Sequence, residues 1–210
     1  MPPTGIDRGT GSTLTEEVGG RTYAVDSRFT GGLAEGAQLR SVEFDGCAFD
    51  GCVLAGVDLT GCTFTECTFT GVDLSRAVVT DARFAECGFA DCRLLGMNFA
   101  LAHTVTLAAP FRFERCRLDY ASFRGIDVTG SLWRDCRLVE ADFGEAVARR
   151  VDFAGSDLSR TVFAGTDLRE ASFVGAVGYA FDIRDNKVRG ARFEVAEAGR
   201  LLLPFGVELI

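Results

Sequence analysis

Bulky apolar residues return at every fifth position along most of this chain. In FDGCAFDGCVLAGVDLTGCTFTECTFTGVDL, residues 44–74, every fifth residue is Phe or Leu, and the residue two positions before it is Cys or Val. The pattern continues to Phe99, shifts, and resumes from Phe113 to Phe173. A period of five fits neither the period of a helix, about 3.6 residues, nor that of a strand. Two inward residues around one outward residue, followed by a turn, predict a short extended side that ends at a corner.

Four such sides would close one coil of about 20 residues, and stacked coils would lie about 4.8 Å apart, the spacing of hydrogen-bonded strands. Repeats of fixed period are typical of solenoids, in which each unit buries its apolar surface against its neighbours. Gly46, Gly51, Gly56, Gly61 and Gly71 fall at the corners, where permissive backbone dihedrals are useful. We therefore predict an all-β solenoid of about eight coils, roughly 40 Å long.

The segments that depart from the repeat set the predicted boundaries. Residues 1–22 are rich in Gly, Thr and Pro and are interpreted as a flexible lead-in. Residues 23–193 form the predicted solenoid, with a register break at 100–112 where the step from Phe99 to Phe113 is 14 residues. At most a few residues could protrude from the coils at this break.

Residues 194–210 are predicted to cap the exposed end of the solenoid. Val195, Ala198, Leu201 and Leu202 suit one face of a short helix that Pro204 would end. The residues that suit a terminal strand after it are Val207, Leu209 and Ile210. This segment offers more apolar surface than a cap needs, so end-capping alone and binding of a partner both stay open.

Acidic residues are concentrated in the first half of the chain. The net charge is −8, and residues 1–111 hold 14 acids and 7 bases, while residues 112–210 hold 16 acids and 15 bases. A negative surface repels a nucleic-acid backbone and attracts a basic cleft, although any soluble solenoid also needs polar outward residues. The acids predicted to form a partner-binding face are Asp45, Asp50, Asp58, Glu66 and Asp73.

The eight cysteines occupy the small inward position of the repeat, where Cys acts as a small hydrophobe. Because a coil holds about 20 residues, Cys47, Cys67 and Cys87 should stack on one side, and Cys116 should stack on Cys136. We expect free thiols in a reducing cytosol rather than disulfides. No C-x-x-C pair is present to suggest a zinc site, and we expect no metal.

Signals of an enzyme are weak. The single histidine, His103, lies in the irregular segment and is interpreted as structural or solvated. The sequence has no phosphate-cradling Gly loop with its Lys and no G-x-S-x-G motif, so we expect neither catalysis nor a cofactor. No apolar run suits a membrane span and no signal peptide is evident, which predicts a cytoplasmic protein without membrane contact.

The units CAFDG, CVLAG, VDLTG, VDLSR, SDLSR and TDLRE resemble the pentapeptide-repeat family. The resemblance covers roughly Phe29 to Phe193 and implies a right-handed quadrilateral β-helix. Its closing segment, ASFVGAVGYAFDIRDNKVRGARFEVAEAGRLLLPFGVELI, is similar to that of the Qnr quinolone-resistance proteins, MfpA and, above all, the albicidin-resistance proteins. The stretches LLGMNFALA and FRFERC also resemble this last branch.

This resemblance implies a dimer joined through the carboxy-terminal ends, whose rods are similar to duplex DNA in width, length and charge. It implies binding to DNA gyrase or topoisomerase IV, no direct binding of nucleic acid, and resistance to an albicidin- or quinolone-like drug. The dimer interface implied for this chain comprises Leu201, Leu202, Phe205, Val207, Leu209 and Ile210.

Two features of the chain differ from those relatives. The break leaves no room for the large projecting loops of Qnr proteins from Gram-negative bacteria, and the acids concentrate in the coils that would lie far from the dimer centre. Two other functions therefore stay open: a structural or interaction solenoid with an unrelated basic protein partner, and direct binding of a drug, although a filled core offers little cavity.

Overall fold

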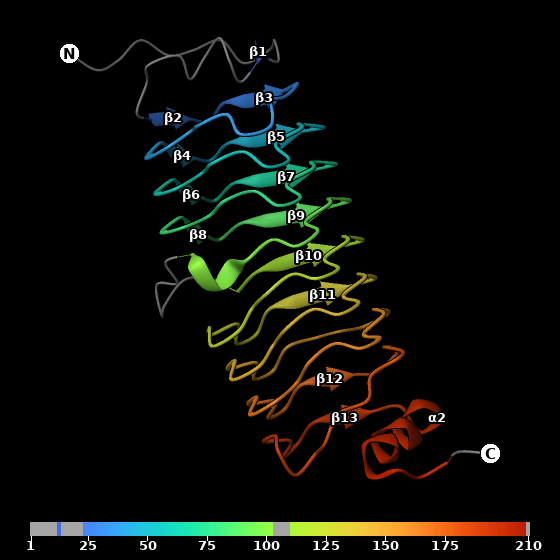
Figure 1. Cartoon of the computed structure of the whole chain (residues 1–210). Coiled ribbons are helices and arrows are strands. Elements are labelled where there is room, and N and C mark those ends of the chain that lie inside the picture. Colours follow the sequence, from blue (N-terminus) through green and yellow to red (C-terminus); the bar gives the residue numbers. More distant parts are fainter. Residues whose placement is uncertain (1–11, 14–22, 103–109, 209–210) are drawn as a thin grey trace.

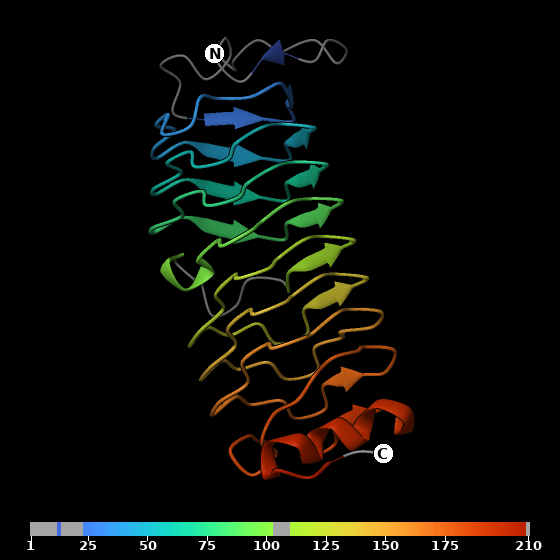
Figure 2. The same cartoon turned by 45° about the vertical axis from the view of Figure 1, so that its right-hand side comes forward.

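The structure is a computed structural model that describes residues 12–13, 23–102 and 110–208. Short parallel strands stack into a four-sided rod with the amino-terminal coils at one end and the only α-helix of these residues at the other (Figures 1 and 2). This arrangement confirms the predicted quadrilateral β-helix of about eight coils.

The strands form two main ladders. One sheet has the order β1-β3-β5-β7-β9-β10-β11 and the other the order β2-β4-β6-β8, while β12 and β13 pair separately. The strands are β1 Ser12–Thr13, β2 Tyr23–Val25, β3 Arg28–Thr30, β4 Glu43–Asp45, β5 Ala48–Asp50, β6 Thr63–Thr65, β7 Thr68–Thr70, β8 Arg83–Ala85, β9 Gly88–Ala90, β10 Arg112–Glu114, β11 Leu132–Arg134, β12 Ser172–Phe173 and β13 Arg192–Phe193. Strand β1 lies in the predicted lead-in and pairs with β3, so the described part of that segment joins the ladder.

We number the four sides in the order in which the chain follows them. Side 1 is the β2-β4-β6-β8 sheet, which the bridges Asp127–Val147, Val147–Asp167 and Asp167–Lys187 continue at the same place in the later coils. Side 2 is the seven-stranded sheet with β12 and β13. Bridges along the row Val53, Asp73, Arg93, Arg117, Arg137, Asp157 and Val177 mark side 3. Bridges along the rows Gln38, Asp58, Val78 and Asn98, Ser122, Asp142, Val162 mark side 4.

The bulky inward residues build continuous aromatic columns inside the rod. On side 2, the ring of Phe69 stacks on those of Phe49 and Phe89 with centroids 4.7 Å apart in both pairs. The column continues through Phe113 and Trp133, and every ring in it is buried. In-register parallel pairing forces this stacking, because each strand residue lies directly over its equivalent one coil earlier.

The small inward residues satisfy backbone carbonyl groups as well as filling space. The Cys52 thiol donates to the carbonyl oxygen of Phe29 at 3.3 Å, and the Ser156 hydroxyl donates to that of Trp133 at 2.9 Å. Both partners lie 23 residues earlier. Cys in the early coils and Ser or Thr in the later ones therefore fill the same structural position.

The corners use the left-handed backbone region, as the glycines suggested, but they do not require Gly. Gly46 has φ 61°, and Glu66, one coil later at the same corner, has φ 52°. A left-handed conformation costs a non-Gly residue about 1–2 kcal/mol. Fifteen non-Gly residues accept this conformation among the described residues, so the stacked core outweighs the local strain.

The register break coincides with one longer coil. Phe113 of β10 pairs with Phe89, 24 residues earlier, whereas Phe89 pairs with Phe69, 20 residues earlier, so this coil holds four extra residues. The 3-10 helix η1 (Phe99–Leu101) begins this departure, and residues 103–109, including His103, lie outside the described part.

The closing segment forms the predicted short helix, α2 (Val195–Ala198), which continues as the 3-10 helix η2 (Gly199–Phe205). Pro204 lies inside η2 and does not end it; Gly206, with φ 74°, follows as its C-cap. Proline fits there because its fixed φ of about −65° lies within the range of a 3-10 helix. Residues 207–208 are not in a strand, so the predicted terminal strand is wrong for Val207. Leu209 and Ile210 lie outside the described part, and for them the strand stays a prediction.

Candidate functional site

The five acids predicted to form one face do not lie on one side of the rod. Asp45 belongs to β4 on side 1, and Glu66 lies at the corner between sides 1 and 2. Asp50 belongs to β5 on side 2, Asp73 lies on side 3, and Asp58 lies on side 4. Only Asp45 and Glu66 are thus brought onto a common surface.

The other three are partly neutralised by arginines. Asp50 faces the Arg28 guanidinium at 3.2 Å, and Asp73 faces that of Arg93 at 3.6 Å. The Asp58 carboxylate accepts from the Arg40 Nε at 2.7 Å. Arg40, with a further contribution from Thr60, lowers the pKa of Asp58 to about 2. These carboxylates are therefore less available to an outside partner.

Side 1 carries a row of exposed acids. Grouping the acids by their position along the sequence did not identify this row. Within the described residues, none of these acids takes part in an ion pair, and Arg83 is the one base among them on this part of side 1. We call them the acidic row: Asp26, Glu43, Asp45, Glu66 and Glu86.

The acidic row accounts for most of the charge imbalance in the early coils. Residues 23–102 hold 11 acids and 5 bases, and the acidic row with Arg83 contributes five of these acids and one of these bases. The remaining three sides are therefore close to neutral. The signal was present in the sequence: Glu66 and Glu86 are 20 residues apart, and Asp26 occupies the same corner two coils earlier than Glu66.

The packing beneath the acidic row fixes its geometry. The ring of Phe44 stacks on that of Phe64 at 5.0 Å with an interplanar angle of 4°, so β4 and β6 are held in register. Gly46 separates two acidic corners, and a Cβ atom there would lie 2.6 Å from the Asp26 Oδ1. Consecutive coils thus present carboxylates from a rigid wall at about 4.8 Å steps.

The carboxy-terminal end exposes apolar side chains, as predicted. Leu202, Phe205 and Val207 are exposed, whereas Leu201 is half-buried and packs against the core. Leu209 and Ile210 lie outside the described residues. Leu203 is exposed to a similar degree but was not predicted. The prediction assumed an α-helical face containing Leu201 and Leu202, whereas this part of the chain is the 3-10 helix η2, which turns its side chains differently.

Two further features of this end bear on binding. The Arg184 guanidinium lies over the Phe205 ring, 4.4 Å from its centroid, and holds that ring at the surface. Val195 is 91% exposed, so the predicted apolar face of the helix does not pack wholly against the solenoid. Dimerisation through this apolar end stays a prediction.

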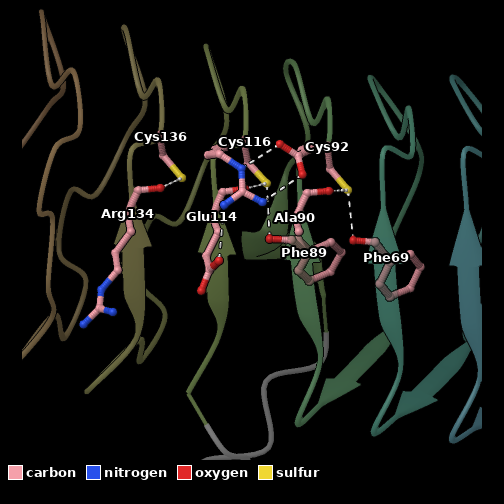
Figure 3. A network of polar contacts seen from close by, with 10 residues as sticks. Phe69, Phe89, Ala90, Cys92, Glu114, Cys116, Arg134 and Cys136 are labelled. Carbon is pink, nitrogen blue, oxygen red and sulfur yellow. Dashed lines mark hydrogen bonds and ion pairs between the residues drawn. The ribbon is translucent and has the colours of Figure 1, made fainter.

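The thiols form internal ladders and no reactive site. Cys116 stacks between Cys92 and Cys136, because the longer coil brings Cys92 into the row (Figure 3). Cys92 donates to the Phe69 carbonyl oxygen at 3.3 Å and Cys136 to that of Arg134 at 3.2 Å (Figure 3). All eight cysteines are free and buried.

Burial also makes these thiols poor nucleophiles. It raises the pKa of both Cys52 and Cys62 to about 11, so their reactive thiolate form is scarce at neutral pH. The described residues contain no group of three or more His, Cys, Asp or Glu placed to hold a metal ion. They also contain no helix long and apolar enough to cross a membrane.

Comparison with known proteins identifies the family. A model described as "Pentapeptide repeat region" matches residues 42–123, and one described as "Pentapeptide repeats (8 copies)" matches residues 136–175. The chain belongs to the pentapeptide-repeat family. A search of curated protein sequences found no match.

Solved structures of pentapeptide-repeat proteins are similar to this one in fold. HetL, from the cyanobacterium Nostoc sp. strain PCC 7120 and involved in heterocyst differentiation regulation, is 19% identical with a TM-score of 0.58; the match covers 85% of this chain and 90% of HetL. Full-length QnrB1, a plasmid-mediated fluoroquinolone resistance protein, is 20% identical with a TM-score of 0.47; the match covers 86% of this chain and all of QnrB1. At 19% identity the likeness to HetL concerns the fold alone.

Proposed function

We propose that this pentapeptide-repeat protein is a non-enzymatic mimic of DNA that binds DNA gyrase or topoisomerase IV and confers resistance to an albicidin- or quinolone-like inhibitor. The acidic row is the observation that carries this proposal. It places unpaired carboxylates on one side of a rigid rod, where they can face the Lys and Arg side chains with which such an enzyme holds the phosphates of DNA.

The spacing of the row supports mimicry of a polyanion. Duplex DNA carries one negative charge per about 1.7 Å of helix axis, counting both strands. The acidic row supplies about one or two charges per coil, at coil steps of about 4.8 Å. A basic partner would therefore meet a weaker but regular line of negative charge. Its binding would depend on the salt concentration, because the partner would release the anions bound to its Lys and Arg side chains.

The closing segment supports a dimeric form of the mimic. The exposed apolar residues Leu202, Leu203, Phe205 and Val207 give this end the character of an interface core. In a dimer joined there, the two acidic rows would occupy the far arms. Such a dimer would contact the enzyme at two separated basic regions and would leave the centre for other contacts. A cytoplasmic location follows from the proposed target.

Gyrase supercoiling with purified protein tests the proposal. The protein would be titrated into the reaction alone, with a quinolone and with albicidin. Inhibition by the protein alone, or rescue from either drug, is the expected result. If the folded protein has no effect up to tens of micromolar in all three reactions, the proposal fails, and a solenoid that binds an unrelated basic protein becomes the better account.

A further inference from the structure

Side 1 reverses its charge between the two ends of the rod. In its last three coils the exposed surface is rich in bases, which continue the ladder Val147, Asp167, Lys187. These bases form what we call the basic patch: Arg149, Arg150, Arg169, Lys187 and Arg189. The acids in the same coils of this side are Asp167 and Glu170, so the patch is net positive.

Two arginines of the basic patch form ion pairs with Asp167, and the other three bases form none among the described residues. Asp167 accepts from the Nε of Arg149 at 2.7 Å and from the Arg169 guanidinium at 2.7 Å. Arg150, Lys187 and Arg189 take part in no ion pair within the described residues, and each is exposed. These three side chains therefore keep their charge available to a partner.

The positions of the two patches match each other under a two-fold rotation. The acidic row occupies the first four coils of side 1, from β2 to β8, and the basic patch occupies the last three. If two copies are laid antiparallel with side 1 against side 1, each acidic row lies against the basic patch of the other copy. The same contact then forms twice, which is the isologous arrangement expected of a two-fold dimer.

From this self-complementarity we propose that two copies of the chain pair side by side and antiparallel through side 1. The occupant of this surface is thus a second copy of the chain, held by Glu43, Asp45 and Glu66 of one copy against Arg150, Lys187 and Arg189 of the other. The free protein would pair in this way whether or not it binds a topoisomerase.

The size of side 1 makes the pairing weak. At about 3.3 Å per residue along a strand and about 4.8 Å per coil, a side is roughly 12 Å wide and 40 Å long and covers roughly 500 Å² per copy. This is below the roughly 800 Å² per partner of a standard stable interface. The acidic row lies within residues 26–86 and the basic patch within residues 149–189, so contact is made at two separate places. Charge rather than apolar burial holds the copies together, and salt screens such contacts over about 10 Å at 0.1 M.

The pairing would have a consequence for any partner of the acidic row. Self-paired copies hide the carboxylates of Glu43 and Glu66 against the basic patch. A basic partner would therefore compete with the second copy for the acidic row. It would bind best at low protein concentration, or where it carries more positive charge than the basic patch. The basic patch thus acts as a built-in competitor.

Two complementary variants test the proposal. The first reverses acids (Glu43→Lys, Asp45→Lys, Glu66→Lys), and the second reverses bases (Arg150→Glu, Lys187→Glu, Arg189→Glu). All six side chains point outward from the core, so both variants should keep the circular dichroism spectrum of the wild type. Sedimentation equilibrium would be run at about 100 µM protein on the wild type, each variant and their equimolar mixture, in 50 and 500 mM NaCl.

The wild type and the mixture should each show an additional association in 50 mM NaCl that weakens about tenfold or more in 500 mM NaCl. Each variant alone should lack it, because its side 1 then carries predominantly one sign of charge. Any association through the carboxy-terminal end would be common to all samples and insensitive to these changes. A mixture no heavier than the separate variants would overturn the proposal, as would an association of equal strength in both salts.

Discussion

Removal of one central ring tests the claim that stacked aromatic columns hold the rod together. Phe69 is 1% exposed, and its ring stacks at 4.7 Å on Phe49 and on Phe89 and meets Phe64 edge-on at 5.5 Å. Truncation of a buried Phe to Ala costs about 3–5 kcal/mol. Loss of three ring contacts places Phe69→Ala toward the upper part of this range, since each aromatic pair is worth about 0.5–1.5 kcal/mol beyond its buried area.

The assay is urea unfolding followed by far-ultraviolet circular dichroism and by the fluorescence of Trp133, the single tryptophan of the chain. With a slope of about 2 kcal/mol per M urea, a loss of about 4 kcal/mol lowers the midpoint by about 2 M. The matched control is Thr70→Ala in the same strand, at an exposed outward position, which should change the stability by less than about 0.5 kcal/mol.

The two probes should also separate in the Phe69→Ala variant. Each coil contacts only its neighbours, so weakening at β7 acts on the early coils while Trp133 in β11 reports on later ones. Circular dichroism should therefore change at lower urea than fluorescence does. Coincident transitions with a midpoint shift below about 0.5 M would refute the view that this column carries the stability of the early coils.

Three further predictions follow from the structure. Arg40 lowers the pKa of Asp58 from 3.8 to about 2, so the pair stabilises the fold above pH 3.8 and this contribution is lost as the pH falls towards 2. The urea midpoints of the wild type and of Arg40→Gln should therefore differ at pH 7 and converge near pH 2. The buried thiols should resist iodoacetamide at pH 8, with mass spectrometry showing alkylation only after unfolding; rapid labelling of the native protein would contradict this. Leu202→Asp should give a monomer in light scattering at 500 mM NaCl, whereas the exposed control Val53→Asp should not; a dimer in both would exclude the carboxy-terminal end as the interface.

The five-residue period predicted the fold well because it records directly which residues point inward. Phe44 and Phe64 are buried as the pattern requires, and the corners fall where the glycines indicated. The period alone could not show that Cys92 stacks on Cys116, since that contact depends on how many sides the chain follows between Phe99 and Phe113. Four extra residues in one coil change which positions become neighbours.

The candidate site was harder to predict because outward residues belong to four different surfaces. Asp45 and Asp50 are five residues apart, yet they lie on adjacent sides, and Asp50 has an arginine partner from the coil before. A count of charge along the sequence sums all four sides together. Sorting positions by their place in a 20-residue coil would have separated the acidic row from the paired acids.

Binding of matched charge-reversed variants to DNA gyrase tests the account most directly. The first variant, Glu43→Lys with Glu66→Lys, reverses two members of the acidic row. The second, Asp135→Lys with Asp157→Lys, makes the same change in net charge at two acids that lie off side 1 and outside any ion pair of the described residues. Fluorescence anisotropy of labelled protein would report the affinity at 100 mM salt.

We expect the acidic-row variant to bind at least about tenfold more weakly than the wild type, because each reversal replaces an attraction at the interface by a repulsion. The control should stay within about threefold of the wild type. Equal losses in both variants would mean that net charge alone governs binding, and unchanged affinity of the acidic-row variant would contradict the central claim that these carboxylates face the enzyme.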